Sequence, residues 1–242
     1  MSESDDGMRL QVFMAHSGVA SRRACERIIL DGRVRINGKV ASELGVRVKD
    51  GDRVELDGRL LGIEDRKRYI LLNKPAGYLS AMQDLAGRPL AVSLLRGVEE
   101  RVYNVGRLDQ WSSGLLLFTN DGELAYLLVH PSGGIEKEYF VVADSPLGDD
   151  FFAAFRDGLE IDGVAYRALS AMRAGPDSAR ITLVEGKNRE IRRVLEYFGK
   201  RPRILTRIRI GSLSIGEMGE GSFRDLSEAE VAALRSYGRE KK

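Results

Sequence analysis

The stretch GRLDQWSSGLLLFTNDG, residues 106–122, constrains the fold more than any other part of the chain. Its apolar run at 115–118 is followed by Asn-Asp-Gly at 120–122, which is a typical turn signal. The pattern predicts a buried strand over 114–120. The apolar spacing beyond the turn predicts a helix over 122–130. A strand of this kind must lie near the centre of a sheet.

The charged residues in front of this strand are the first candidates for function. Asp109 lies in the predicted loop that leads into the strand, and Arg107 precedes it by two residues. An aspartate in such a position is most often a turn or cap residue. A functional interpretation of Asp109 therefore depends on evidence from the rest of the chain.

The remaining patterns mix strands and helices without a strict strand-helix-strand rhythm. This favours an α+β fold whose catalytic part has a mixed, mostly antiparallel central sheet with flanking helices. No Gly-rich nucleotide-binding motif is present, so we expect no nucleotide cofactor. The expected strands cover residues 69–75, 101–108, 114–120, 137–143, 179–185 and 203–211, and the expected helices cover 122–130, 149–158 and 189–199.

Composition indicates an ordinary soluble globular protein, with 43% hydrophobic and 31% charged residues among 242. No apolar run approaches the roughly 20 residues of a membrane span, and the acidic N-terminus does not resemble a secretory signal. One cysteine, Cys25, and two histidines make a disulfide or a structural zinc site improbable. We expect a cytoplasmic protein that is a monomer and binds no metal or cofactor.

The chain is expected to contain two folded units. The polar, charged stretch GIEDRKR separates them and is predicted to be a linker. The predicted parts are a disordered tail at 1–7, a small domain at 8–61, the linker at 62–68, a larger domain at 69–236 and a basic tail at 237–242.

The small domain combines one clear helix with a β-ribbon. Ser21 is a plausible N-cap of a helix that ends at Gly32, and Asn37-Gly38 is a strong hairpin signal. A helix and a ribbon rich in arginine resemble the S4 RNA-binding module. The alternative is a small α+β domain with ordinary surface arginines. The resemblance implies that six residues face RNA phosphates: Arg22, Arg23, Arg27, Arg33, Arg35 and Lys39.

A second basic region lies near the C-terminus. Nine Lys and Arg residues stand against two Glu residues between Lys187 and Arg209, so this segment has a net charge of +7 although the whole chain has +2. Such a concentration suits an RNA backbone, although a solvated basic face is the plainer alternative. Apolar residues alternate with the charges, which indicates a folded surface.

Four motifs in order resemble those of the RsuA/RluB-type pseudouridine synthases, which modify ribosomal RNA. The stretch that begins at Gly106 resembles the family's central G-R-L-D motif with its downstream G-L-L and T-x-D-G elements. The other three are NKPAGYLS at 73–80, resembling K-P-x-G, EKEYFVV at 136–142, resembling K-x-Y-x-V, and the basic segment at 185–213. With the S4-like head, the resemblance covers almost the whole chain.

The resemblance implies the identity of the catalytic residues. Asp109 would act at C1′ of the target uridine, either as a nucleophile or by abstracting a proton. Tyr139 would stack on the flipped base and is a candidate to take the proton from C5. Arg192 would be the cationic partner of Asp109, with Arg193 as the second choice because the register could slip by one residue. Three more residues are implied to contact RNA, namely Arg107, Lys74 and Lys137.

The implied reaction is site-specific isomerisation of uridine to pseudouridine without a cofactor. We expect the substrate to be a structured stem-loop of large-subunit ribosomal RNA, presenting a flipped uridine. The alternatives are a small-subunit enzyme or a non-catalytic ribosome-associated RNA-binding protein. A glycosidase would need two carboxylates across the scissile bond. Asp121 and Glu123, at the far end of the predicted strand, are too distant from Asp109 for that.

One residue departs from the family pattern. Trp111 stands two positions after Asp109, where a bulky indole is not expected. It can pack under the loop or stack on a nucleotide that flanks the target. We favour packing.

Overall fold

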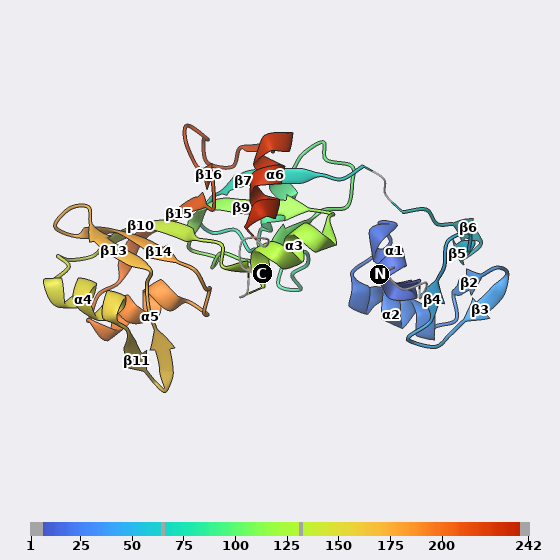
Figure 1. Cartoon of the computed structure of the whole chain (residues 1–242), viewed down its shortest axis with the longest axis horizontal. Coiled ribbons are helices and arrows are strands. Elements are labelled where there is room, and N and C mark those ends of the chain that lie inside the picture. The colour runs from blue at the N-terminus through green and yellow to red at the C-terminus, as the bar shows by residue number, and fades with distance from the viewer. Residues whose placement is uncertain (1–6, 64–65, 131–132, 238–242) are drawn as a thin grey trace. The chain divides into compact units, whose positions relative to one another are not determined.

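A computed structural model describes residues 7–63, 66–130 and 133–237 of the chain (Figure 1). The chain divides into two compact units, residues 1–67 with 99–101 and residues 68–98 with 102–242. The division after Lys67 falls inside the stretch predicted as a linker. The predicted tails lie outside the described residues, except for Gly7 and Tyr237.

The first unit packs two helices against short strands. β2, β3, β5 and β6 form a four-stranded antiparallel sheet, and β1 pairs with β4. The helices are α1 (Leu10–His16) and α2 (Arg22–Leu30). The strands are β1 (Met8–Arg9), β2 (Val34–Ile36), β3 (Lys39–Ala41), β4 (Arg47–Val48), β5 (Val54–Leu56) and β6 (Arg59–Leu60).

The local signals in this unit are confirmed. The Ser21 hydroxyl accepts a hydrogen bond from the Ala24 amide at 3.2 Å, as an N-cap should. Asn37 and Gly38 have φ angles of 52° and 80° and join β2 to β3, which matches the left-handed turn that favours Asn-Gly. Cys25 is fully buried in the core of this unit.

The second unit is built on a nine-stranded sheet, covered by helices and by a small separate hairpin. Its sheet strands are β7 (Tyr69–Lys74), β8 (Tyr103–Val105), β9 (Ser113–Thr119), β10 (Lys137–Ala143), β13 (Ser170–Arg173), β14 (Ser178–Leu183), β15 (Pro202–Ile210), β16 (Leu213–Ser214) and β17 (Phe223–Asp225). The other elements are η1 (Ala91–Leu94), α3 (Gly122–Val129), α4 (Asp149–Asp157), α5 (Glu190–Tyr197), α6 (Glu228–Ser236), β11 (Leu159–Ile161) and β12 (Val164–Tyr166).

The main path through the sheet runs β13-β14-β10-β15-β9-β7-β17, with β16 added to β15 and β8 to β9. Only β9 and β15 are parallel among the described pairs, so the sheet is mixed and mostly antiparallel, as predicted. Gly114 lies at that junction with a φ of 100°. A Cβ at this position would lie 2.3 Å from the carbonyl oxygen of Arg207, so the two strands can approach only because the residue is glycine.

Strand β9 is buried on both faces, as its continuous apolar run predicts. Leu115 and Leu117 point into a core formed with α3 and α6, and Leu116 and Phe118 point into the opposite core, which includes η1. A third core lies between the sheet and helices α4 and α5. The strand is thereby a rigid base for the loop that precedes it.

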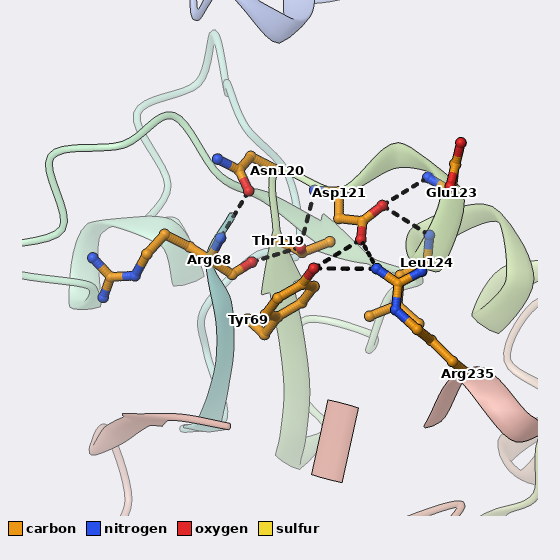
Figure 2. A network of polar contacts seen from close by, with 8 residues as sticks. All are labelled: Arg68, Tyr69, Thr119, Asn120, Asp121, Glu123, Leu124 and Arg235. Carbon is orange, nitrogen blue, oxygen red and sulfur yellow. Dashed lines mark hydrogen bonds and ion pairs between the residues drawn. The ribbon is translucent and has the colours of Figure 1, made fainter. Parts of the chain in front are cut away.

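The C-terminal end of β9 is held by a dense polar network (Figure 2). One carboxylate oxygen of Asp121 caps α3 by accepting the amides of Glu123 and Leu124, both at 3.1 Å. The other accepts the Tyr69 hydroxyl at 2.9 Å and pairs with Arg235 of α6. Burial alone would raise the pKa of Asp121, but these hydrogen bonds and the Arg235 charge outweigh it and lower the pKa.

Several elements were not predicted from the sequence, among them β13, β17 and α6. Helix α6 has a readable start, because Ser227 and Glu230 form a capping box. Within the described residues, no helix is long and apolar enough to cross a membrane.

Candidate active site

A pocket in the second unit brings together three residues that are far apart in the sequence. Asp109 comes from the loop before β9, Tyr139 from β10 and Arg192 from α5, and all three line the pocket. Arg107 lines it as well and is exposed. The structure therefore assembles the predicted catalytic set in one place.

Asp109 and Arg192 form an ion pair, with 3.5 Å between Arg192 Nε and Asp109 Oδ2. The Arg192 side chain is 11% exposed and the Asp109 side chain 31%. Burial lowers the pKa of Arg192, and the charge of Asp109 opposes that shift. Arg193, the second choice from sequence, is not among the residues that line the pocket. Of the two arginines, Arg192 is the one that pairs with Asp109 and lines the pocket.

Arg192 also holds the loop that carries Asp109. Its Nη2 donates to the carbonyl oxygen of Trp111 at 2.8 Å and to the hydroxyl of Ser112 at 3.1 Å. The Ser112 amide in turn donates to the Asp109 carbonyl at 3.0 Å, which closes a tight turn. One guanidinium thus contacts the carboxylate and the backbone that carries it.

Lys74, which the family resemblance implies as an RNA contact, has a side chain that is fully buried at the end of β7 in the structure without RNA. Its Nζ donates to the carbonyls of Pro75, Tyr78 and Gln110, at 2.8, 2.9 and 3.3 Å. Burial lowers the pKa of Lys74 to about 8, with a further contribution from the charge of Arg207. Lys74 thereby ties the loop that carries Asp109 to the loop that follows β7.

Two reciprocal pairs of hydrogen bonds complete this tie. The Gly77 amide donates to the Gln110 carbonyl at 2.7 Å, and the Gln110 side chain donates to the Gly77 carbonyl at 3.1 Å. The Ser80 hydroxyl and the backbone of Leu108 exchange hydrogen bonds of 3.0 and 3.1 Å. The physical reason for the NKPAGYLS motif is therefore that it clamps the loop carrying Asp109.

The start of α5 contributes pocket residues that were not singled out from sequence. Arg189 lines the pocket and adopts a left-handed backbone with a φ of 52°. Glu190 is 3% exposed, and its Oε2 accepts the Lys187 amide at 3.1 Å. Burial raises the pKa of Glu190 to about 6. In the sequence, Arg189 and Glu190 belong to a basic stretch at the start of a predicted helix. Nothing in that stretch separated them from their neighbours.

A second pocket shares Arg107, Tyr139 and Gly186 with the first. Lys137 lines it, half-buried, and donates to the carbonyls of Ile135 and Val184. Burial lowers the pKa of Lys137 to about 8.

Arg207 of β15 lines the second pocket too and is 3% exposed. Its Nε donates to the Leu115 carbonyl at 2.7 Å, and its Nη2 has no hydrogen-bond partner among the described residues. Sequence reasoning missed Arg207 because its burial depends on the contact between β9 and β15, which are far apart in the chain.

The expectation that Trp111 packs under the loop is wrong, because 67% of the residue is exposed. The six S4-like candidates Arg22, Arg23, Arg27, Arg33, Arg35 and Lys39 are all exposed. Arg33 is already paired with Asp57, by hydrogen bonds of 3.1 and 2.5 Å, and Arg35 donates to the Gly38 carbonyl. Contact of these residues with RNA stays a prediction.

The pocket offers a partly exposed carboxylate with a guanidinium beside it and a tyrosine from β10. Such a set can act on a sugar carbon or take up a proton, and the tyrosine ring can hold a planar base. Within residues 7–63, 66–130 and 133–237, no cluster of three or more potential metal ligands is found.

Comparison with known proteins decides between the chemistries open to this set. Residues 68–197 match the RNA pseudouridylate synthase family, and residues 8–54 match the S4 domain. This chain belongs to the RNA pseudouridine synthase family. Its members are isomerases, and the S4 resemblance seen in the sequence is confirmed.

Relatives of this RNA pseudouridine synthase match over nearly the whole chain. It is 36% identical to the ribosomal large subunit pseudouridine synthase B of Bacillus subtilis, covering 94% of this chain and 96% of that protein. It is 37% identical to the dual-specificity RNA pseudouridine synthase RluF of Shigella flexneri, covering 95% and 79%. A crystal structure of a pseudouridylate synthase superposes with a TM-score of 0.70 at 25% identity, covering 94% of this chain and all of the other.

Proposed function

We propose that this protein isomerises a uridine in a stem-loop of large-subunit ribosomal RNA, with Asp109 as the catalytic carboxylate. One observation carries the proposal. The Asp109 carboxylate lies in a pocket with Tyr139 and with the Arg192 guanidinium 3.5 Å away. Family membership supplies the reaction class, and this geometry supports the choice of residues.

The reaction breaks the N1–C1′ bond, turns the base and joins C5 to C1′. Asp109 starts it either by attacking C1′ or by removing a proton from the sugar. Both routes need the charged carboxylate in a pocket that loses water when the base enters. Arg192 supplies a positive charge beside that carboxylate, with its Nε 3.5 Å from Asp109 Oδ2.

Tyr139 has two assigned tasks. Tyr139 lines the pocket from β10, and we assign its ring to stack on the flipped uracil. After C5 has bonded to C1′, the hydrogen on C5 must leave as a proton, and the phenol oxygen is the group we assign to accept it. Arg107, exposed at the mouth, is assigned to a phosphate of the RNA.

The substrate assignment rests on two supports. The Bacillus subtilis relative carries a large-subunit name, and the match covers 94% of this chain. The S4 domain supplies a separate RNA-binding surface, which suits a structured substrate larger than one nucleotide. The dual-specificity name of the Shigella relative makes a second RNA worth testing.

The test is pseudouridine mapping of ribosomal RNA from cells with and without the gene. We expect one or a few pseudouridines to disappear from large-subunit RNA and to return when the wild-type gene is restored. The Asp109→Asn gene should not restore them. Loss of sites only in small-subunit RNA would overturn the substrate assignment. Unchanged maps of every RNA would leave the protein as a non-catalytic RNA binder.

A further inference from the structure

Trp111 is the only tryptophan in the chain, and it is exposed on the loop that carries Asp109. A large aromatic ring in water has an unfavourable free energy unless a partner covers it. Trp111 is 67% exposed, although Ser112 and Leu108 of the same loop are buried. The loop is therefore packed against the protein over part of its length, and the exposure of Trp111 does not reflect a detached loop.

The backbone beneath the indole is rigid. The carbonyl of Trp111 accepts a hydrogen bond from Arg192 at 2.8 Å, and the carbonyl of the preceding Gln110 accepts from Gly77 and Lys74. The indole Cζ3 lies 3.9 Å from the position that a Cβ on Gly77 would occupy. The backbone that carries the ring is held by these hydrogen bonds, so little backbone entropy is lost when a ligand covers the indole.

The surroundings indicate a nucleic-acid ligand. Trp111 lies two residues from Asp109, a span of at most about 7 Å. Four basic residues line the adjacent pocket, namely Arg107, Lys187, Arg189 and Arg192. An exposed aromatic ring next to clustered cations is the arrangement that binds unpaired bases, whereas a protein-binding patch would be ringed by further apolar side chains.

We propose that the Trp111 indole stacks on an unpaired nucleobase adjacent to the target uridine and thereby holds the RNA strand open at the pocket. Trp111 acts in binding and does not touch the reacting atoms. Stacking on one aromatic ring typically changes RNA affinity by about five- to 150-fold. The inference rests on the proposed function for the identity of the target, but the contact can be measured separately.

The experiment uses the full-length protein and unmodified transcripts of large-subunit and small-subunit ribosomal RNA. Tryptophan emission of the wild type reports on Trp111 alone. We expect saturating RNA to quench it. Dissociation constants are then compared for Trp111→Ala, Trp111→Leu and Trp111→Phe. We expect Ala and Leu to weaken binding about tenfold, and Phe, which keeps a flat ring, to stay within about threefold of the wild type.

Two further readouts separate stacking from a structural role. At subsaturating protein, the single-turnover rates of the variants should fall in parallel with their RNA affinities, and their unfolding midpoints in urea should coincide with that of the wild type, because the indole is exposed. Unchanged emission with RNA bound would overturn the inference, and so would equal affinities of Ala and wild type, or of Leu and Phe. If the wild type isomerises neither transcript, the proposed function fails, while the emission and affinity data still decide the stacking.

Discussion

Two aspartates stand at opposite ends of the same strand, and their environments differ in almost every respect. Asp121, after β9, is 8% exposed in its side chain and has two backbone amides, a hydroxyl and a guanidinium as partners. Asp109, before β9, is 31% exposed, and its carboxylate has one ion-pair partner at 3.5 Å within the described part of the chain. The comparison teaches that a satisfied carboxylate stabilises the fold, whereas an open one is available for chemistry.

The largest expected effect is on turnover and comes from Asp109, the more exposed of the two aspartates. Asp109→Asn removes the charge that starts the reaction, so we expect the single-turnover rate to fall about 10⁴-fold. RNA affinity should not weaken, because the change removes a negative charge from a surface that faces phosphates. Release of tritium from uridine labelled at C5 measures the rate. A rate within tenfold of the wild type would show that another group starts the reaction.

For Asp121, whose carboxylate is held by several partners, the expected effect is on the stability of the fold. Asp121→Asn loses the ion pair with Arg235 and weakens the cap of α3, so we expect the free energy of unfolding to fall by about 2 kcal/mol. The single-turnover rate of the folded protein should stay within about threefold. Urea unfolding followed by circular dichroism measures the loss.

The same variant makes a pH prediction. The pKa of Asp121 is lowered in the folded state, so its stabilisation is fully present above the ordinary value of 3.8 and is lost as pH falls through the folded value. The difference in unfolding free energy between wild type and Asp121→Asn should therefore shrink below about pH 4. A difference that stays constant down to pH 2 would contradict the assigned network.

Lys74 adds to the comparison because it is a buried cation whose hydrogen bonds hold the loop that carries Asp109. Lys74→Met removes three hydrogen bonds to the two loops, so we expect turnover to fall about tenfold through misplacement of Asp109. The folded pKa of about 8 lies below the ordinary 10.5, so the wild type should gain stability relative to this variant as pH rises from 8 to 10. Wild-type turnover in Lys74→Met would contradict the clamp.

The smallest expected effect is on RNA binding by two arginines of the S4 unit, one open and one already paired. Arg27 is exposed on α2, whereas the Arg33 guanidinium is already held by Asp57. We expect Arg27→Gln to weaken RNA binding a few-fold and to reduce the slope of log affinity against log salt by about 1. Arg33→Gln should change the slope less. The reverse order would show that the pair with Asp57 opens on RNA.

Short-range signals explain what could be predicted from the sequence. The strand at 113–119, the turn at Asp121 and the Ser21 cap each depend on neighbours within four residues. Asp109, Tyr139 and Arg192 were found because family motifs carry them, and the structure places them around one pocket.

Long-range contacts explain the rest. Burial of Lys74 depends on two loops folding over it, and burial of Arg207 on the parallel contact at Gly114. Neither contact leaves a local pattern, so both residues looked like ordinary cations.

The central claim is that Asp109, and not Asp121, is the carboxylate that starts the isomerisation. The most direct measurement is the single-turnover rate of the two asparagine variants on one large-subunit RNA transcript, with RNA at saturation and both proteins below their unfolding transitions. We expect Asp109→Asn to be slower than Asp121→Asn by about three orders of magnitude or more. Equal rates for the two variants would contradict this assignment.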